Sequence, residues 1–296
     1  MAANAYLEAL QKQNAENNNP EVDKKEDPLE GIIIPPQPKI LMELKSCGGK
    51  IDKIIELIEE DAGISAGVIK TINSPLYALR ARVNSISKAV QLLGLDSILS
   101  IVNALALRAS ISNDMQTQME EFWDSSTDVA KAAGAIATQT KLCNRDTAYT
   151  AGLFHNCGIP LLLQKHKNFY DILKNAYEDD KGEFIEIERS AFKIDHAFVG
   201  YKVCKLWNLS ERVCLAIRYH HHGNAFLKSD KFNQDLKVLG ATLMLAEHIA
   251  ETHRTLGGKE EDKDWTLFGE NVLDVLDMNK DDYENTKEYI HETVYA

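Results

Sequence analysis

Apolar residues recur with the period of an α-helix from residue 40 onwards. The first clear apolar face has the spacing i, i+3, i+4, i+7 and i+11 and consists of Ile51, Ile54, Ile55, Ile58 and Ala62. The later stretch SILSIVNALALRA is apolar on nearly all sides, which places it in the centre of the fold. Only Phe184–Ile187 alternates weakly with the period of a strand. The pattern predicts an all-α fold.

Residues that commonly begin or end helices separate the apolar segments. Asp96, Asp195 and Ser210 each precede an apolar run and are predicted N-caps. Gly94 follows the run SKAVQLL in the position of a helix C-cap. Asn73-Ser74-Pro75 ends another helix, because Asn and Ser bond to nearby backbone and Pro disfavours helical geometry in the residue before it.

The stretch AGLFHNCGIP, residues 151–160, contains the most suggestive side chains. Its apolar residues predict a buried helix that carries His155 and Asn156 to its end, and Gly158 and Pro160 predict a turn directly afterwards. Two readings stay open here. The pair points into a pocket where a metal could bind, or Asn156 caps the helix while His155 donates to a buried carbonyl.

Composition restricts the partners that the chain can have. Its net charge of −12 repels nucleic acid and anionic membranes, so we expect neither as a partner. No apolar run is long enough to cross a bilayer, and the N-terminus lacks the pattern of a secretory signal, so we expect a cytoplasmic protein. The five cysteines are widely spaced without a C-x-x-C motif, which indicates neither disulfides nor a structural zinc site.

Both ends of the chain differ in composition from its middle. Residues 1–32 are rich in Asn, Glu and Lys, and we expect a mobile tail there. Residues 256–296 are strongly acidic with helical spacing in Val272, Val275 and Leu276, and we expect a peripheral, partly mobile helical appendage.

Five of the nine histidines stand at predicted helix ends, where a pocket would open. They are His155, His196, His220, His221 and His222. A single buried histidine is most often structural, but the combination of His155-Asn156, Asp195-His196 and His220-His221 favours a common site. The other four have no such context and are interpreted as surface residues: His166, His248, His253 and His291.

Several short motifs, in this order, resemble the HDOD family, the regulatory branch of the HD phosphohydrolase superfamily that includes the cyclic-di-nucleotide phosphodiesterases of HD-GYP type. The motifs are Glu60-Asp61, Asn73-Ser74 with Tyr77, ISKAVQLLG at 86–94, Phe122-Trp123, AGLFHNCG, DHAFVG at 195–200, Trp207-Asn208-Leu209 and His220-His221. The resemblance implies a two-lobed helical domain over residues 33–255, with a first bundle at 33–118 and an HD-like bundle at 119–255.

The resemblance also implies that metal ligands of an active HD enzyme are missing. Ser125 stands where the first histidine is expected, and His155-Asn156 replaces the His-Asp pair. Glu247 is the nearest match to the distant acid, while His196 and His220-His221 correspond to the additional histidines. The resemblance thus leaves His155, His196, His220, His221 and Glu247 as a residual metal set, with Asn156, Ser125 and Asp195 in the pocket. A catalytic metal needs anionic ligands, and Asn156 offers only a neutral carbonyl oxygen.

Three functions remain open from the sequence. The leading hypothesis is a non-catalytic bacterial signalling module that binds a protein partner or a small signal, without a dedicated cofactor and at most with a weakly bound divalent transition metal. Its input would arrive from another protein, since no receiver, GGDEF or EAL-type sequence is present. The alternatives are a metal-dependent phosphohydrolase acting on a nucleotide or cyclic dinucleotide, and a ligand pocket without turnover. The oligomeric state stays open.

Overall fold

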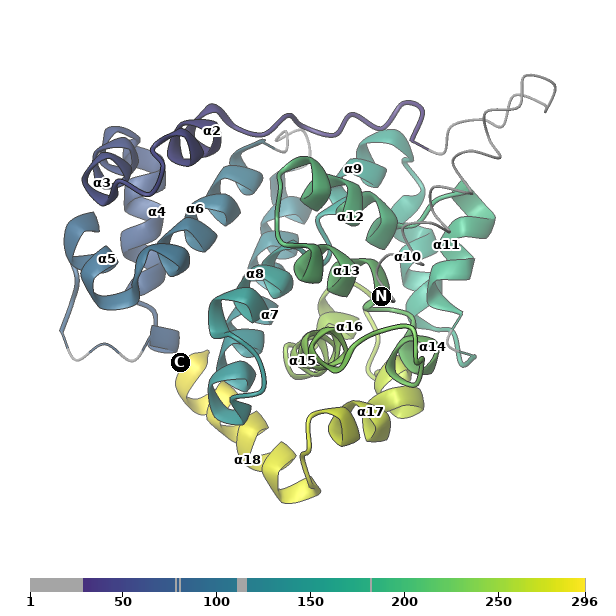
Figure 1. Ribbon diagram of the computed structural model, residues 1–296. Helices are drawn as coiled ribbons and strands as arrows, with labels where there is room; N and C mark the ends of the chain where they lie inside the picture. Colours follow the sequence, from purple (N-terminus) through teal and green to yellow (C-terminus); the bar gives the residue numbers. More distant parts are fainter. Residues whose placement is uncertain (1–28, 78, 80, 111–115, 182, 296) are drawn as a thin grey trace.

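The computed structural model describes residues 29–77, 79, 81–110, 116–181 and 183–295. Regular secondary structure in these residues consists of helices, and no strand occurs among them (Figure 1). The all-α prediction is therefore confirmed for this part of the chain. Most of the predicted N-terminal tail, residues 1–28, lies outside the described residues.

The first bundle occupies one side of the molecule in Figure 1. Its helices are α2 (Lys39–Ser46), α3 (Ile51–Glu60), α4 (Ala62–Ile72), the 3-10 turn η1 (Pro75–Tyr77), α5 (Ile86–Leu93) and α6 (Leu95–Ser110). Ile54 and Ile58 on the predicted apolar face are buried, whereas Ile51 in the first turn is 49% exposed. Asn73 ends α4 as predicted, and its side chain bonds to the backbone of Ile69 and to both N–H and C=O of Val83.

The second bundle surrounds helix α15 (Figure 1). Its helices are α7 (Gln116–Thr140), α8 (Arg145–Phe154), α9 (Gly158–Lys165), α10 (Phe169–Tyr177), α11 (Phe184–Phe192), α12 (His196–Leu206), α13 (Glu211–Tyr219), α14 (Gly223–Leu227), α15 (Gln234–Ile249) and α16 (Thr252–Thr255). The segment before α2 runs extended along this bundle, where the Trp207 indole N–H donates to the Pro35 carbonyl at 3.0 Å.

Two glycines on either side of His155, Gly152 and Gly158, permit close contacts between helices. A Cβ on Gly152 of α8 would lie 2.7 Å from the Cα of Ala130 in α7. A Cβ on Gly158 at the start of α9 would lie 2.1 Å from the carbonyl oxygen of His196 in α12. Helix α8 therefore packs closely on α7, and the turn after α8 lies directly against the start of α12.

The weak alternation at Phe184–Ile187 does not mark a strand. These residues belong to helix α11, in agreement with the all-α prediction, because Phe184 and Ile185 share a buried face with Glu188 one turn later. Two local predictions were wrong. Asp96 lies inside the first turn of α6 and does not cap it. Gly158 and Pro160 do not end a helical region: the turn is confined to residues 155–157, and both residues belong to the first turn of α9, where proline needs no N–H. The predicted caps Asp195 and Ser210 are confirmed.

The acidic C-terminal segment is helical, as predicted, but it is not peripheral. It forms α17 (Lys263–Val275), α18 (Lys280–Tyr289) and a π-helical turn, η2 (Ile290–Val294). These helices run along the lower edge of the molecule in Figure 1 and end beside α7. Val272, Leu276, Ile290 and Val294 are buried, so the segment contributes to the core. No helix in the described ranges combines the length and apolarity required to span a membrane.

Candidate functional site

His155 enters the interior from the end of α8, in which every residue from Ala148 to Phe154 is buried. Its Nδ1 lies 2.5 Å from the carbonyl oxygen of Gly152. A carbonyl only accepts hydrogen bonds, so Nδ1 carries a proton and donates it there. The other ring nitrogen, Nε2, lies 3.3 Å from Oε1 of Glu247 on α15 without forming a hydrogen bond. The sequence-predicted pair His155 and Glu247 is thus brought together.

His196 is the first residue of α12 and is fully buried. The carboxylate of Glu188 on α11, also without solvent exposure, accepts from the His196 backbone N–H and from its Nδ1, each at 2.7 Å. Both oxygens of Glu188 are therefore occupied by one residue, which fixes the position of the His196 ring. Its Nε2 is directed toward His220, and the two Nε2 atoms lie 3.3 Å apart.

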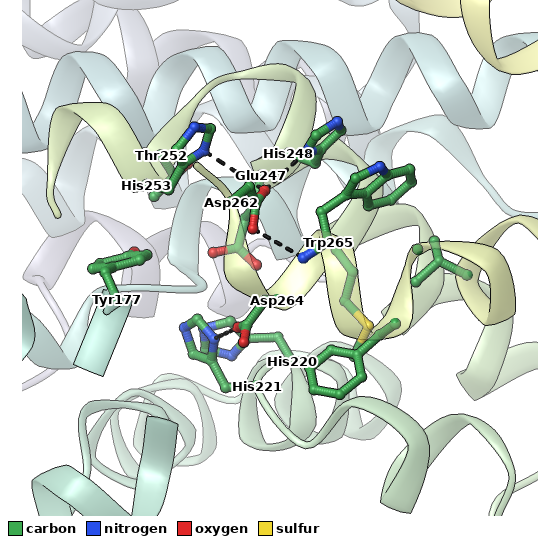
Figure 2. A pocket seen from close by; sticks show the side chains of 14 residues that line it. Tyr177, His220, His221, Glu247, His248, Thr252, His253, Asp262, Asp264 and Trp265 are labelled. Atoms are coloured by element: carbon green, nitrogen blue, oxygen red, sulfur yellow. Dashed lines mark hydrogen bonds and ion pairs between the residues drawn. The ribbon is translucent and has the colours of Figure 1, made fainter. Parts of the chain in front are cut away.

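His220 and His221 follow directly after α13, and both are buried. The Nδ1 of His220 donates to the Ile217 carbonyl at 2.6 Å. The Nδ1 of His221 donates to Oδ2 of Asp264, on α17, at 3.1 Å (Figure 2). In both rings Nδ1 is bonded to a fixed oxygen, so Nε2 is left to face the other histidines.

The residues present fit a metal ion at three of the five predicted positions. Ligand atoms of His196, His220 and His221 all lie within 4.8 Å of one another. Two nitrogens bound to one tetrahedral zinc at about 2.1 Å lie about 3.4 Å apart, and the two Nε2 atoms of His196 and His220 are separated by 3.3 Å. Each ring also has its second nitrogen bonded to an oxygen, which is the usual arrangement of metal-binding histidines.

The other part of the expected HD site does not fit a metal. Asn156 is 1% exposed, and neither atom of its amide has a hydrogen-bond partner among the described residues. The reading in which Asn156 caps α8 is therefore wrong, whereas the predicted bond from His155 to a carbonyl is present. The Ser125 hydroxyl on α7 is likewise buried without a partner. A neutral amide and a hydroxyl supply no charge to balance a metal.

Asp195 does not belong to the histidine cluster. One of its oxygens accepts from Phe198 N–H at 2.7 Å as the N-cap of α12, and the carboxylate pairs with Arg189 at 2.8 Å and with Arg218 at 3.5 Å. Its role is to begin the helix that carries His196. His222 also lies apart, and burial together with the charges of Arg218 and Arg189 lowers its pKa to about 4.

A small cavity borders the cluster on the side of α17 (Figure 2). Its volume is about 40 Å³, and Tyr177, His220, His221 and Glu247 line it from the second bundle. Helix α17 and its N-cap form another wall, with residues between Asp262 and Val272. Since a water needs about 10–15 Å³ of such space, the cavity has room for a few waters or an ion and its waters.

Burial and neighbouring charges set the protonation of this cavity. Burial, with the adjacent rings of His221, His196 and His155, lowers the pKa of His220 well below its usual value. Burial alone would lower the pKa of His221 too, but the hydrogen bond to Asp264 and the charge of Glu247 raise it overall. Burial, with Glu247 nearby, raises the pKa of Tyr177 well above its usual value. His220 is consequently neutral at pH 7 and has a lone pair on one ring nitrogen.

Two of the four histidines assigned to the surface are not there. His253 is 7% exposed, and His248 is half-buried. His248 donates from Nδ1 to Asp262 at 2.8 Å, bonds through Nε2 to the Tyr283 hydroxyl at 2.9 Å, and stacks on Trp265. These contacts hold the C-terminal segment against α15, which the sequence pattern did not reveal. His291 is exposed, as predicted, and His166 is partly buried.

Sequence reasoning missed the carboxylates that position the histidines. Glu188 has a detectable signal, because it lies one turn after Phe184 and Ile185 on the apolar face of a helix, but the weak alternation of Phe184–Ile187 obscures this helical spacing. Asp262 and Asp264 are two acidic residues in an acidic segment, and nothing in the local pattern distinguishes them.

Solved structures of similar fold come from several bacteria. A candidate phosphohydrolase from Shewanella amazonensis matches with a TM-score of 0.62 at 21% identity, over 87% of this chain and 90% of that one. An HDOD domain protein of unknown function from Geobacter sulfurreducens matches with a TM-score of 0.58 at 23% identity, over 90% and 95%. A candidate signal transduction protein from Marinobacter aquaeolei matches with a TM-score of 0.63 at 20% identity, over 96% and 62%.

Comparison of the sequence itself found a relative and a matching family model. An uncharacterized protein of Treponema pallidum is 24% identical in an alignment of 198 residues that covers 64% of this chain and 38% of that relative's length. The model of the HDOD domain matches residues 34–223, which contain His155, His196, His220 and His221. The chain belongs to the HDOD domain family.

Proposed function

We propose that this protein is a non-catalytic signalling module that works by binding a protein partner or a small signal. The observation that carries the proposal is the size of the cavity beside the histidines, about 40 Å³. Pockets for small organic ligands occupy about 300–1,000 Å³. A nucleotide therefore has no room at the only cluster of potential metal ligands found in the described residues.

The charges around the cluster support the same proposal. Glu188 is bonded to His196 through both oxygens, and Asp264 is bonded to the Nδ1 of His221. Asn156 supplies no charge in place of the aspartate that the family resemblance leads one to expect. A divalent transition metal held by His196, His220 and His221 would polarise a bound water. The chain would supply three neutral imidazoles as its ligands, and the carboxylate of Glu247 in the cavity wall lies beside His155 Nε2.

The alternative function is a metal-dependent phosphohydrolase acting on a nucleotide or cyclic dinucleotide. The observation in its favour is that the fold brings together all five residues of the predicted metal set, from α8–α9, α12, α13 and α15. Activity would require the wall formed by α17 to move away from the cavity.

One experiment separates the two functions. The untagged full-length protein, purified without chelator, is analysed for metal by mass spectrometry and then assayed with Mn²⁺, Fe²⁺, Ni²⁺ and Mg²⁺ on a panel of nucleotides and cyclic dinucleotides. We expect no release of phosphate or linear dinucleotide above that of a His155→Ala, His196→Ala double variant. The opposite result would be turnover that the double variant loses and the exposed control variant His291→Ala retains. It would show that the protein is a phosphohydrolase and would contradict the proposal of a non-catalytic module.

The binding role has its own test. Crosslinking in the source cell followed by mass spectrometry should recover a reproducible protein partner, and the crosslinked residues of this chain would define the surface. A panel of nucleotides screened by thermal shift tests the small-signal form. A saturable shift that His155→Ala and His196→Ala leave unchanged would mean that the signal binds away from the cavity, and a shift that they abolish would mean that the cavity opens to admit it.

A further inference from the structure

The first turn of α17 presents two carboxylates to the second bundle, from a part of the chain that lies beyond the family match at residues 34–223. Asp262 caps α17 by accepting from Trp265 N–H at 3.0 Å and pairs with His248. Asp264 reaches further and accepts from Nδ1 of His221 at 3.1 Å (Figure 2). Asp264 is therefore the point where the C-terminal segment contacts the histidine cluster.

The contact with Asp264 determines which nitrogen His221 offers to the cluster. The ring is stacked on Phe184, with centroids 4.0 Å apart and planes at 5°, so its plane is fixed but its two nitrogens could exchange places by a half-turn. The Asp264 carboxylate selects the orientation with Nδ1–H toward α17. Nε2 is then buried without a hydrogen-bond partner among the described residues, and it is the ring nitrogen left for a metal. One ring nitrogen each of His196, His220 and His221 lies within 4.8 Å of the others. A carboxylate that bonds the outer nitrogen also makes the inner one a better donor to a metal.

We propose that Asp264 is a positioning residue for a divalent transition metal held by His196, His220 and His221, and that metal binding and docking of α17 strengthen each other. The inference rests on the residual metal site of the proposed function. If Asp264 in its docked position raises metal affinity by some factor, bound metal must stabilise the docked α17 by the same factor. The fraction of molecules with α17 docked would then depend on whether a metal ion occupies the site.

The rival explanation is that Asp264 serves only to dock α17. Helix α17 offers a matched control, because Asp274 is an exposed aspartate on the same helix, away from the cavity. Asp264→Asn and Asp274→Asn remove the same charge from the same helix, but only the first alters the partner of His221. Near-identical melting curves and helix content would show that both variants are folded.

The test is a titration of chelator-treated full-length protein with Zn²⁺ and with Co²⁺. We expect about one metal ion per chain in the wild type, a tetrahedral Co²⁺ absorption spectrum, and an affinity lowered about 10–100-fold in Asp264→Asn. Asp274→Asn should bind as the wild type does. In parallel, Zn²⁺ should slow hydrogen exchange in residues 262–275 of the wild type, and this protection should be reduced in Asp264→Asn.

Failure of the inference and failure of the metal site give different results. Wild-type protein that binds no Zn²⁺ or Co²⁺ would overturn both. A different result would be that wild type and Asp264→Asn bind metal equally tightly and give the same Co²⁺ spectrum. This result would support the three-histidine site but would show that Asp264 does not position its ligands. The exchange measurement on the wild type needs no variant, and unchanged exchange in α17 on filling the site would also overturn the coupling.

Discussion

The Nε2 atoms of His196 and His220 lie 3.3 Å apart, and both side chains are buried. His220 donates from Nδ1 to a carbonyl and, being neutral, has a lone pair on Nε2. His196 is bonded through its own Nδ1 to Glu188, so the two Nε2 atoms are the ring nitrogens that face each other. At this distance a proton shared between the two nitrogens, or a metal ion bound to both, would fit.

This arrangement predicts the tautomers of two histidines. His155 and His220 each donate from Nδ1 to a backbone carbonyl, of Gly152 and Ile217 respectively. Long-range ¹H–¹⁵N spectra of the metal-free protein at pH 7.5 should show the proton of His220 on Nδ1, and His155 should also have a protonated Nδ1. Assignment by His155→Gln and His220→Gln identifies the signals. A proton found on Nε2 alone in either ring would contradict the geometry of the site.

Replacing Gly158 should destabilise the protein strongly. The Cβ of Gly158→Ala would lie 2.1 Å from the His196 carbonyl oxygen and 2.9 Å from the Gly200 nitrogen, both backbone atoms that cannot rotate away. We expect the free energy of unfolding, measured in urea, to fall by about 2–3 kcal/mol or more. The control is Gly63→Ala on helix α4, where the new Cβ would meet only Asp61 Oδ1 at 3.4 Å. A small effect at Gly158 would mean that α9 and α12 are farther apart.

Glu188→Gln should weaken the fold although it preserves shape. Glu188 is fully buried and accepts two hydrogen bonds from His196, and an amide would turn one acceptor into a donor facing N–H. We expect a loss of about 1–3 kcal/mol in metal-free protein. Glu186→Gln on the same helix alters an exposed carboxylate that pairs with Arg189, and should change stability little. Equal effects of the two substitutions would show that Glu188 does not hold His196.

His253 should make the protein less stable in mild acid. Burial lowers its pKa below the usual value, against the opposing charge of Asp262, with His248, Glu251 and Arg254 as its other charged neighbours. Below about pH 6.5 the unfolded chain therefore binds a proton on this residue before the folded protein does, and the free energy of unfolding falls as pH falls. His253→Asn removes this contribution.

The measurement is urea unfolding at several pH values between 7.5 and 5. We expect the stability of His253→Asn to decline less steeply toward low pH than that of the wild type. The exposed His291 serves as control, and His291→Asn should leave the slope unchanged. An identical slope in wild type and His253→Asn would show that His253 takes up its proton equally in both states.

Helix ends made much of the site predictable from sequence. His155, His196 and His220 each lie at the end or start of an apolar helix, and side chains at such positions on packed helices meet in the interior. The caps Asp195 and Ser210 were predictable for the same local reason, since they bond within three residues.

Long-range charge pairs were not predictable in this way. Asp264 meets His221 across 43 positions, and Asp262 meets His248 across 14, so in neither pair do both partners belong to the same helix. Composition was misleading as well: an acidic segment is typical of a solvated surface, yet Val272 and Ile290 bury its apolar side. Glu188 was missed because four residues could not distinguish a strand from the start of a helix.

The C-terminal segment is attached to the second bundle at several separate places. Asp264 contacts His221 near its start, His248 on α15 bonds to Asp262 and Tyr283, and the Tyr295 hydroxyl near its end donates to the Asp128 carbonyl on α7 at 3.0 Å. When one attachment opens, the others keep the freed part close to its partner, at an effective concentration on the order of millimolar. Reclosure is then intramolecular and fast, and a molecule that competes for one attachment must displace a group that is tethered nearby. Lasting release of the segment requires all of these contacts to be broken together.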